Sequence, residues 1–248
     1  TLLASSAASD VYKRQIQPHS IRTFKVKLKP SLLEKPGLVT KYLTLNYDRK
    51  CTSWNGFRSN GNFESGYSYA AELLPDSLIV NQVPFHLGEK DVANGVTCKG
   101  DTLQLPTDER YNRVYFLAAS TDADYTATFI CGEKQQTVNI PCYTGFIGQW
   151  GHTNHTKGFF KPAEIAYIGT HRHIANRDCP YEFTYMFKLG LDIPKGATSI
   201  ILPKNEKIVL FASTVVQEAL PQIRVASRLF STSIKEGGIF QKMEIPER

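Results

Sequence analysis

Apolar and polar residues alternate with a period of two through most of this sequence, which restricts the chain to β structure. In IRTFKVKLK, Phe24, Val26 and Leu28 alternate with lysines, and ADYTATFI repeats the pattern. The longest case is EFTYMFKLGLDIP, in which one face would hold Phe183, Tyr185, Phe187, Leu189, Leu191 and Ile193. A pairing shift of one residue would expose that whole face to water, so we expect its register to be firmly fixed.

One further segment, NRVYFLAAS, is continuously apolar from Val114 to Ala119, which is typical of a strand buried on both faces. Turn sequences such as Asn94-Gly95 and Pro194-Lys195-Gly196 separate the strands, and segments with a helical period are nearly absent. The pattern therefore predicts an all-β fold, an antiparallel β-sandwich or jelly roll with one long loop insertion and little helix.

The sequence divides into four parts. Residues 5–15, SSAASDVYKRQ, back-translate without a mismatch into a transposon-end adapter used for sequencing libraries, so we interpret residues 1–15 as adapter-derived and disordered. Residues 16–36 carry a strand with an uncovered apolar face, which indicates the closing strand of a missing upstream β domain. Residues 37–217 are the predicted sandwich, with its long loop at 143–176, and residues 218–248 are a weakly patterned C-terminal tail.

Charge, hydrophobicity and cysteine spacing argue against several classes of protein. Without residues 1–15 the formal net charge falls from +6 to about +5, and the basic residues are dispersed along strands, which argues against a nucleic-acid partner. No apolar run is long enough to span a membrane. The five cysteines show no CxxC spacing, so we expect mostly buried small hydrophobic residues and no zinc ribbon or disulfide scaffold.

The predicted loop 143–176 is the most informative region because loops of that length in compact domains are often functional. It holds His152 and His155 in HxxH spacing and His171 and His173 in HxH spacing. On an extended strand, HxH places both imidazoles on one face, which a metal ion could use. No cysteine or carboxylate pattern flanks them, so we favour hydrogen-bonded loop histidines and assign no metal or cofactor to this segment.

Sugar recognition is a second interpretation of the same region, because aromatic surfaces with a few placed polar groups suit ligand sites. The alternative is that these aromatic residues fix the long loop onto the sandwich. The candidate sugar contacts are Trp150, His152, His155, Tyr167, His171, Arg172, His173 and Tyr181.

An enzyme active site is harder to assemble from the sequence. It contains no GxSxG, HExxH or P-loop motif. Several carboxylates could serve in a glycosidase pair, but nothing in the sequence pairs any two of them. Asn60, Asn62 and Glu64 could also form a small cation site, but with one carboxylate we interpret them as an ordinary turn.

The succession SIRTFKVKL, FRSNGNFESGYSYAAELLP, NQVPFHLG, RYNRVYFLAAS, WGHTNHTKGFFKPAEIAYIGTHRH and YEFTYMFKLGLDIPKGATSIILPKNEKIVLFAST resembles the C-terminal region of bacterial, Bacteroidetes-type α-mannosidases of glycoside hydrolase family 38. The resemblance implies a galactose-binding-like sandwich beside an upstream catalytic domain that is absent from this chain. That domain would supply zinc, its two Asp and two His ligands and an aspartate nucleophile. The resemblance also implies a periplasmic or secreted location.

The resemblance therefore predicts a non-catalytic portion of an α-mannosidase, inactive alone, that supports the catalytic domain. The long polar and aromatic loop leads us to expect that this portion also contacts α-mannoside glycans. A stand-alone carbohydrate-binding module that uses Trp150 or Trp54 is the alternative. A segment that is itself a glycosidase is the third, least favoured hypothesis.

Overall fold

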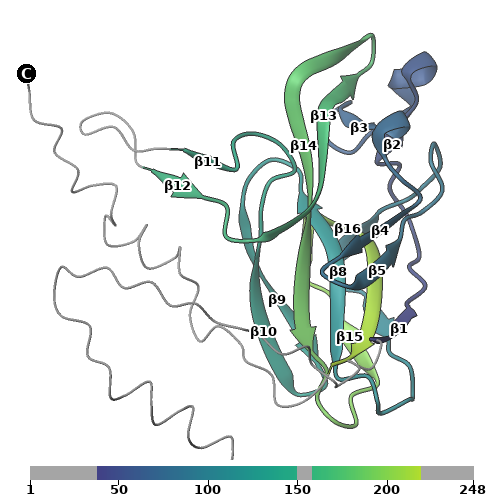
Figure 1. Ribbon diagram of the computed structural model, residues 1–248, viewed down its shortest axis with the longest axis vertical. Coiled ribbons are helices and arrows are strands. Elements are labelled where there is room, and N and C mark those ends of the chain that lie inside the picture. Colours follow the sequence, from purple (N-terminus) through teal and green to yellow (C-terminus); the bar gives the residue numbers. More distant parts are fainter. Residues whose placement is uncertain (1–37, 150–157, 219–248) are drawn as a thin grey trace, which may run out of the picture. The chain divides into compact units, whose positions relative to one another are not determined.

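The structure is a computed structural model that describes residues 38–149 and 158–218 (Figure 1). The predicted all-β class is confirmed: the domain is a β-sandwich, and the helices of the described residues are two 3-10 turns, η1 (Asn55–Asn60) and η2 (Ala71–Leu73). Neither turn could cross a membrane. The strands are β1 (Val39–Tyr42), β2 (Thr52–Ser53), β3 (Ser68–Ala70), β4 (Ser77–Val80), β5 (Val83–His86), β6 (Val96–Lys99), β7 (Thr102–Gln104), β8 (Arg113–Ser120), β9 (Tyr125–Cys131), β10 (Lys134–Ile140), β11 (Gly148–Gln149), β12 (Phe159–Phe160), β13 (Glu164–Ile174), β14 (Arg177–Asp192), β15 (Ser199–Ile201) and β16 (Lys204–Gln217).

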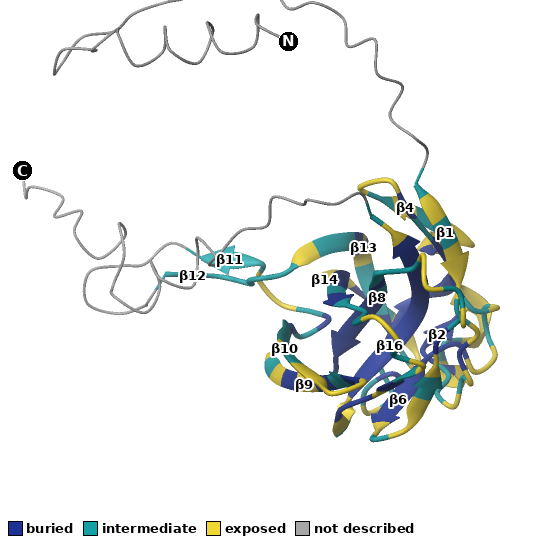
Figure 2. Ribbon diagram, turned by 90° about the horizontal axis from the view of Figure 1, so that it is seen from below, coloured by how far each residue is buried: buried dark blue, intermediate teal, exposed yellow. Residues whose placement is uncertain are grey.

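The larger sheet has eight strands in the order β1-β16-β8-β14-β13-β3-β2, with β6 also paired to β16. All of its pairs are antiparallel except β2 with β3. Strand β8 lies between β16 and β14, and Figure 2 shows these strands as largely buried. Both faces of β8 are covered at this central position, since Phe116 faces one core and Leu117 the other. This explains why β8 is apolar along its whole length.

The smaller sheet, in the order β10-β9-β15-β7, covers one face of the larger sheet and forms the first core with it. Phe116 of β8 stacks on Phe129 of β9 with ring centroids 5.6 Å apart. The predicted alternation of β9 is confirmed, since Ala127 and Phe129 are buried while Thr126 and Thr128 are exposed.

The other face of the larger sheet carries a second core, which the β4–β5 hairpin and the segment from β2 to η2 help to form. Its centre is an aromatic cluster of Phe63, Tyr69, Tyr143 and Phe211. The phenol of Tyr69 donates a hydrogen bond to the carbonyl of Tyr185 at 2.8 Å. This core fixes β3 and η2 against the larger sheet.

The six apolar residues that the sequence places on one face of EFTYMFKLGLDIP do not share one environment. Leu189 and Leu191 lie in the first core, Tyr185 and Phe187 lie in the second, and Phe183 is 40 % exposed. The pairing of β14 with β13 shifts register twice along the hairpin. Both shifts lie between Phe187 and the hairpin turn, whereas the change of core falls between Phe187 and Leu189. One side of this long strand therefore faces two layers in succession.

The prediction of one long loop at 143–176 is wrong in large part. Residues 164–174 form β13, an eleven-residue strand of the larger sheet, and β11 pairs with β12 in a separate small sheet. The apolar alternation of β13 is interrupted by its bulge and by its exposed polar residues, which explains why the sequence resembled a loop.

All five cysteines are free, and Cys51, Cys98, Cys131 and Cys179 are buried, as expected of small hydrophobic residues. The adapter-like residues 1–15, the predicted closing strand in 16–36 and the tail after residue 218 lie outside the described residues.

Candidate functional site

The candidate site lies where β13 and β14 meet in a hairpin, beside η1 and η2 (Figure 1). We call this the hairpin end; there Ile174 pairs with Arg177. His171 and His173 are two residues apart on β13, so both rings lie on the same face, as the HxH spacing predicts for an extended strand. Their ring centroids are 5.4 Å apart.

Glu72 completes the group, and sequence analysis did not connect it with the histidines. Glu72 lies in η2, which follows β3 directly, and β3 pairs with β13. The carboxylate of Glu72 therefore reaches the two imidazoles. Glu72 Oε1 lies 3.0 Å from His173 Nε2 and 3.5 Å from His171 Nε2. The three side chains place one potential ligand atom each within 4.8 Å of one another.

His173 is held from its other side. Its ring is fully buried, and Nδ1 lies 2.9 Å from the hydroxyl of Ser53, which contacts the hydroxyl of Ser68 at 2.7 Å. Burial disfavours the imidazolium and lowers the pKa of His173, although the negative charges of Glu72 and Asp178 oppose this shift. The ring orientation is therefore fixed, with Nε2 directed toward Glu72.

A second carboxylate, Asp178, approaches from β14. Its Oδ1 lies 3.3 Å from His173 Nε2 and accepts a hydrogen bond from Arg58 Nε at 2.6 Å. That bond with Arg58 is the main cause of the lowered pKa of Asp178. The carboxylate therefore stays ionised at the entrance of the group.

Arg172 lies between the histidines in sequence. Its guanidinium carbon is 3.7 Å from the ring centroid of Tyr67, and Nε donates to Glu182 Oε2 at 2.6 Å. It also bonds the hydroxyl of Tyr143 and lies 3.5 Å from Glu64 Oε2. Arg172 thus already has partners on several sides, and Glu64 belongs to this structural network.

The chain matches the family model of the AziU2-like beta-sandwich domain over residues 39–219. It belongs to this family. No curated protein matches the sequence. Neither result includes a mannosidase, so the α-mannosidase resemblance stays a prediction.

The AziU2-like domain exposes some of the predicted sugar contacts and buries others. Tyr181 is 86 % exposed and has a positive φ of 65° where β14 bulges away from β13. The rings of Tyr167 and His173 are buried, so neither is open to a sugar in this structure. Trp150, His152 and His155 lie outside the described residues.

Other exposed aromatic side chains gather at the hairpin end of the AziU2-like domain. Trp54 and Phe57 belong to the η1 segment. The ion pair between Arg58 and Asp178 connects this segment to β14. Phe183 is partly exposed on β14 itself. The sequence pointed to Trp54 but not to Phe57, because nothing in a turn-rich segment shows which aromatic residue remains outside the core.

A second polar group surrounds Lys188 in a hollow of about 550 Å³ that Glu164, Tyr115 and Glu218 also line. Lys188 Nζ donates to the carbonyl of Val80 at 3.0 Å and lies 3.6 Å from Glu164 Oε2. Burial lowers the pKa of Lys188. Burial is also the main cause that raises the pKa of Tyr115 to about 12, and the hydrogen bond with Glu218 contributes to the same shift. The sequence does not indicate this group, because the alternation along β14 places Lys188 on a polar face.

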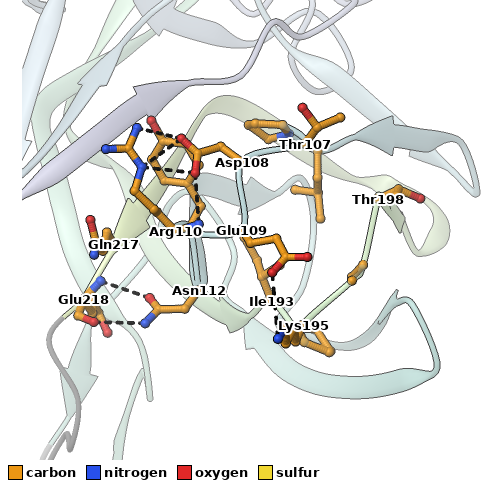
Figure 3. Close-up of a pocket in the computed structure, with 16 residues that line it drawn as sticks. Thr107, Asp108, Glu109, Arg110, Asn112, Ile193, Lys195, Thr198, Gln217 and Glu218 are labelled. Atoms are coloured by element: carbon orange, nitrogen blue, oxygen red, sulfur yellow. Dashed lines mark hydrogen bonds and ion pairs between the residues drawn. The ribbon is translucent and has the colours of Figure 1, made fainter.

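A larger hollow of about 700 Å³ lies at the other end of β14, between the loops around residues 105–112 and 193–198 (Figure 3). Its charged side chains pair with one another: Asp108 with Arg110, and Glu109 with Lys195. Asn112 bonds the backbone of Glu218. The charged groups of this hollow are therefore paired, as Arg58 and Asp178 are at the hairpin end.

Proposed function

We propose that this domain is a non-catalytic β-sandwich that binds carbohydrate at the hairpin end and accompanies the catalytic domain of a larger α-mannoside-hydrolysing protein. Its partner is then a catalytic domain of the same polypeptide, and its ligands are α-mannoside glycans. The similarity to family 38 α-mannosidases supports the substrate class, and the exposed side chains at the hairpin end support the binding role.

Tyr181 is the observation that carries this proposal. A large aromatic side chain with positive φ is strained, and strained, exposed residues cluster at functional sites. A sugar ring stacks on an aromatic face, and nearby charged or polar groups bond its hydroxyls. His171, Arg58 and Asp178 provide such groups at the same end of the sheet.

Calorimetric titration of the full chain with α-mannobiose tests the proposal. We expect binding with a Kd of about a millimolar, and we expect Tyr181→Ala to weaken it about 3- to 10-fold through loss of stacking. Tyr42→Ala is the matched control, because Tyr42 is an exposed tyrosine on β1, an edge strand that two strands separate from β14 in the larger sheet.

Absence of heat at millimolar sugar, or equal effects of the two tyrosine variants, would overturn the binding role. The non-catalytic assignment has its own test. Hydrolysis of an aryl α-mannoside by the purified chain would show that the segment is itself a glycosidase, and we expect none.

A further inference from the structure

We propose that Glu72, His171 and His173 bind one divalent transition-metal ion at the hairpin end. The proposal does not depend on sugar binding, and it assigns a role to a carboxylate that the sequence pattern did not connect with the histidines. It replaces our expectation of simple hydrogen-bonded histidines, which rested on the lack of a carboxylate near them in sequence.

The distances fit a shared ion. Two adjacent ligand atoms that each lie about 2.0–2.1 Å from one ion are roughly 2.8–3.4 Å apart in octahedral or tetrahedral geometry. Glu72 Oε1 lies 3.0 Å from one imidazole Nε2 and 3.5 Å from the other. Since all three ligand atoms lie within 4.8 Å of one another, side-chain shifts of about 1 Å would bring them onto one ion.

The hydrogen bonding around His171 favours an ion over a simple network. Its Nδ1 lies 3.3 Å from the hydroxyl of Thr170, while its Nε2 is buried and has no hydrogen-bond partner. When Nδ1–H donates to Thr170, the Nε2 lone pair is directed toward the carboxylate of Glu72. Two acceptors facing each other repel, and a cation between them removes that repulsion.

The surroundings are those of a metal site. The contact between His173 Nδ1 and Ser53 fixes the ring from behind, as outer-shell hydrogen bonds do for metal-binding histidines. Asp178, held by Arg58, adds a negative charge 3.3 Å from His173 Nε2. The side chains of His171 and Glu72 are 20 % and 24 % exposed, so an ion could enter and keep a position for water or ligand.

The ligand types select the class of ion. Imidazole nitrogens suit Zn²⁺, Co²⁺, Fe²⁺ and similar ions, whereas Ca²⁺ and Mg²⁺ prefer sites built from oxygen alone. Two imidazoles with one carboxylate recur in both zinc and iron sites. We therefore expect Zn²⁺ or Co²⁺ to bind and Mg²⁺ not to compete.

Titration of the metal-stripped full chain with Co²⁺, followed by visible absorption, and with Zn²⁺, followed by calorimetry, tests the proposal. We expect one ion per chain with micromolar or tighter affinity. Glu72→Gln keeps the side-chain shape and removes the charge, and we expect it to weaken binding roughly 100-fold, as we do for His171→Ala. Circular dichroism checks that both variants fold.

Two control variants test whether the ion binds at Glu72, His171 and His173 and not at another histidine. His86→Ala removes an exposed histidine of β5, and the double variant His152→Ala/His155→Ala removes the HxxH pair. We expect both to leave the affinity unchanged. Failure of the parent chain to bind either ion, or binding that Glu72→Gln and His171→Ala leave intact, would overturn the proposal, whatever the sugar titration shows.

Discussion

Phe63→Ala should lower the free energy of unfolding by about 3–5 kcal/mol, the range for removing a buried aromatic side chain. Phe63 is 1 % exposed, and its ring centroid lies 4.7 Å from that of Tyr143, 5.1 Å from Tyr69 and 5.7 Å from Phe211. The truncation leaves a cavity whose rigid ring walls cannot close, so transfer and cavity costs add.

Phe57→Ala is the matched control. The same chemical change removes a side chain that is 65 % exposed, so we expect an effect within about 0.5 kcal/mol. Urea unfolding followed by circular dichroism measures both. Equal losses in the two variants would contradict the placement of Phe63 at the centre of the second core.

Gly95→Ala should cost about 2–3 kcal/mol, because the position has no room for a β-carbon. That carbon would lie 2.4 Å from Cys51 Sγ and 2.7 Å from Val209 Cγ1. The neighbouring Asn94 accepts a hydrogen bond from the backbone N–H of Cys51 at 2.9 Å, just before β2 begins. A shift here would also move Ser53, which holds the ring of His173.

A double-mutant cycle identifies the cause of that loss. Cys51→Ala removes the nearer clashing atom, so we expect Gly95→Ala to cost about 1 kcal/mol less in its presence. Gly56→Ala is the control, since a β-carbon there would have nothing within 4 Å and the backbone of Gly56 has no positive φ. A Gly95→Ala variant as stable as Gly56→Ala would contradict the close packing of β2.

Period-two patterning predicted much of the sandwich, because burial on one or both faces acts directly on local composition. The alternating β9 and the continuous apolar β8 both formed as expected. The same rule failed for β14, because the apolar residues on one side of this strand divide between two cores. Which layer covers each part of a long strand depends on the other strands around it, which a single strand's pattern does not contain.

Only half of the candidate site could be predicted from the sequence. The HxH spacing of His171 and His173 is a local signal, and the structure confirms that the two rings share a face. Glu72 joins them through the pairing of β3 with β13, which no local pattern encodes. The burial of Lys188 could not be predicted from its own strand either. It depends on the neighbouring β4–β5 hairpin, where the carbonyl of Val80 accepts a hydrogen bond from Lys188.

The hairpin end, and not the larger hollow at the other end of β14, is where we expect ligands to bind. Hydrogen–deuterium exchange of the full chain, with and without saturating α-mannobiose, tests this most directly. We expect protection in residues 168–183 and in η1, with no change in residues 105–112 and 193–198. Protection confined to those last two loops, or none anywhere in the chain, would contradict binding at the hairpin end.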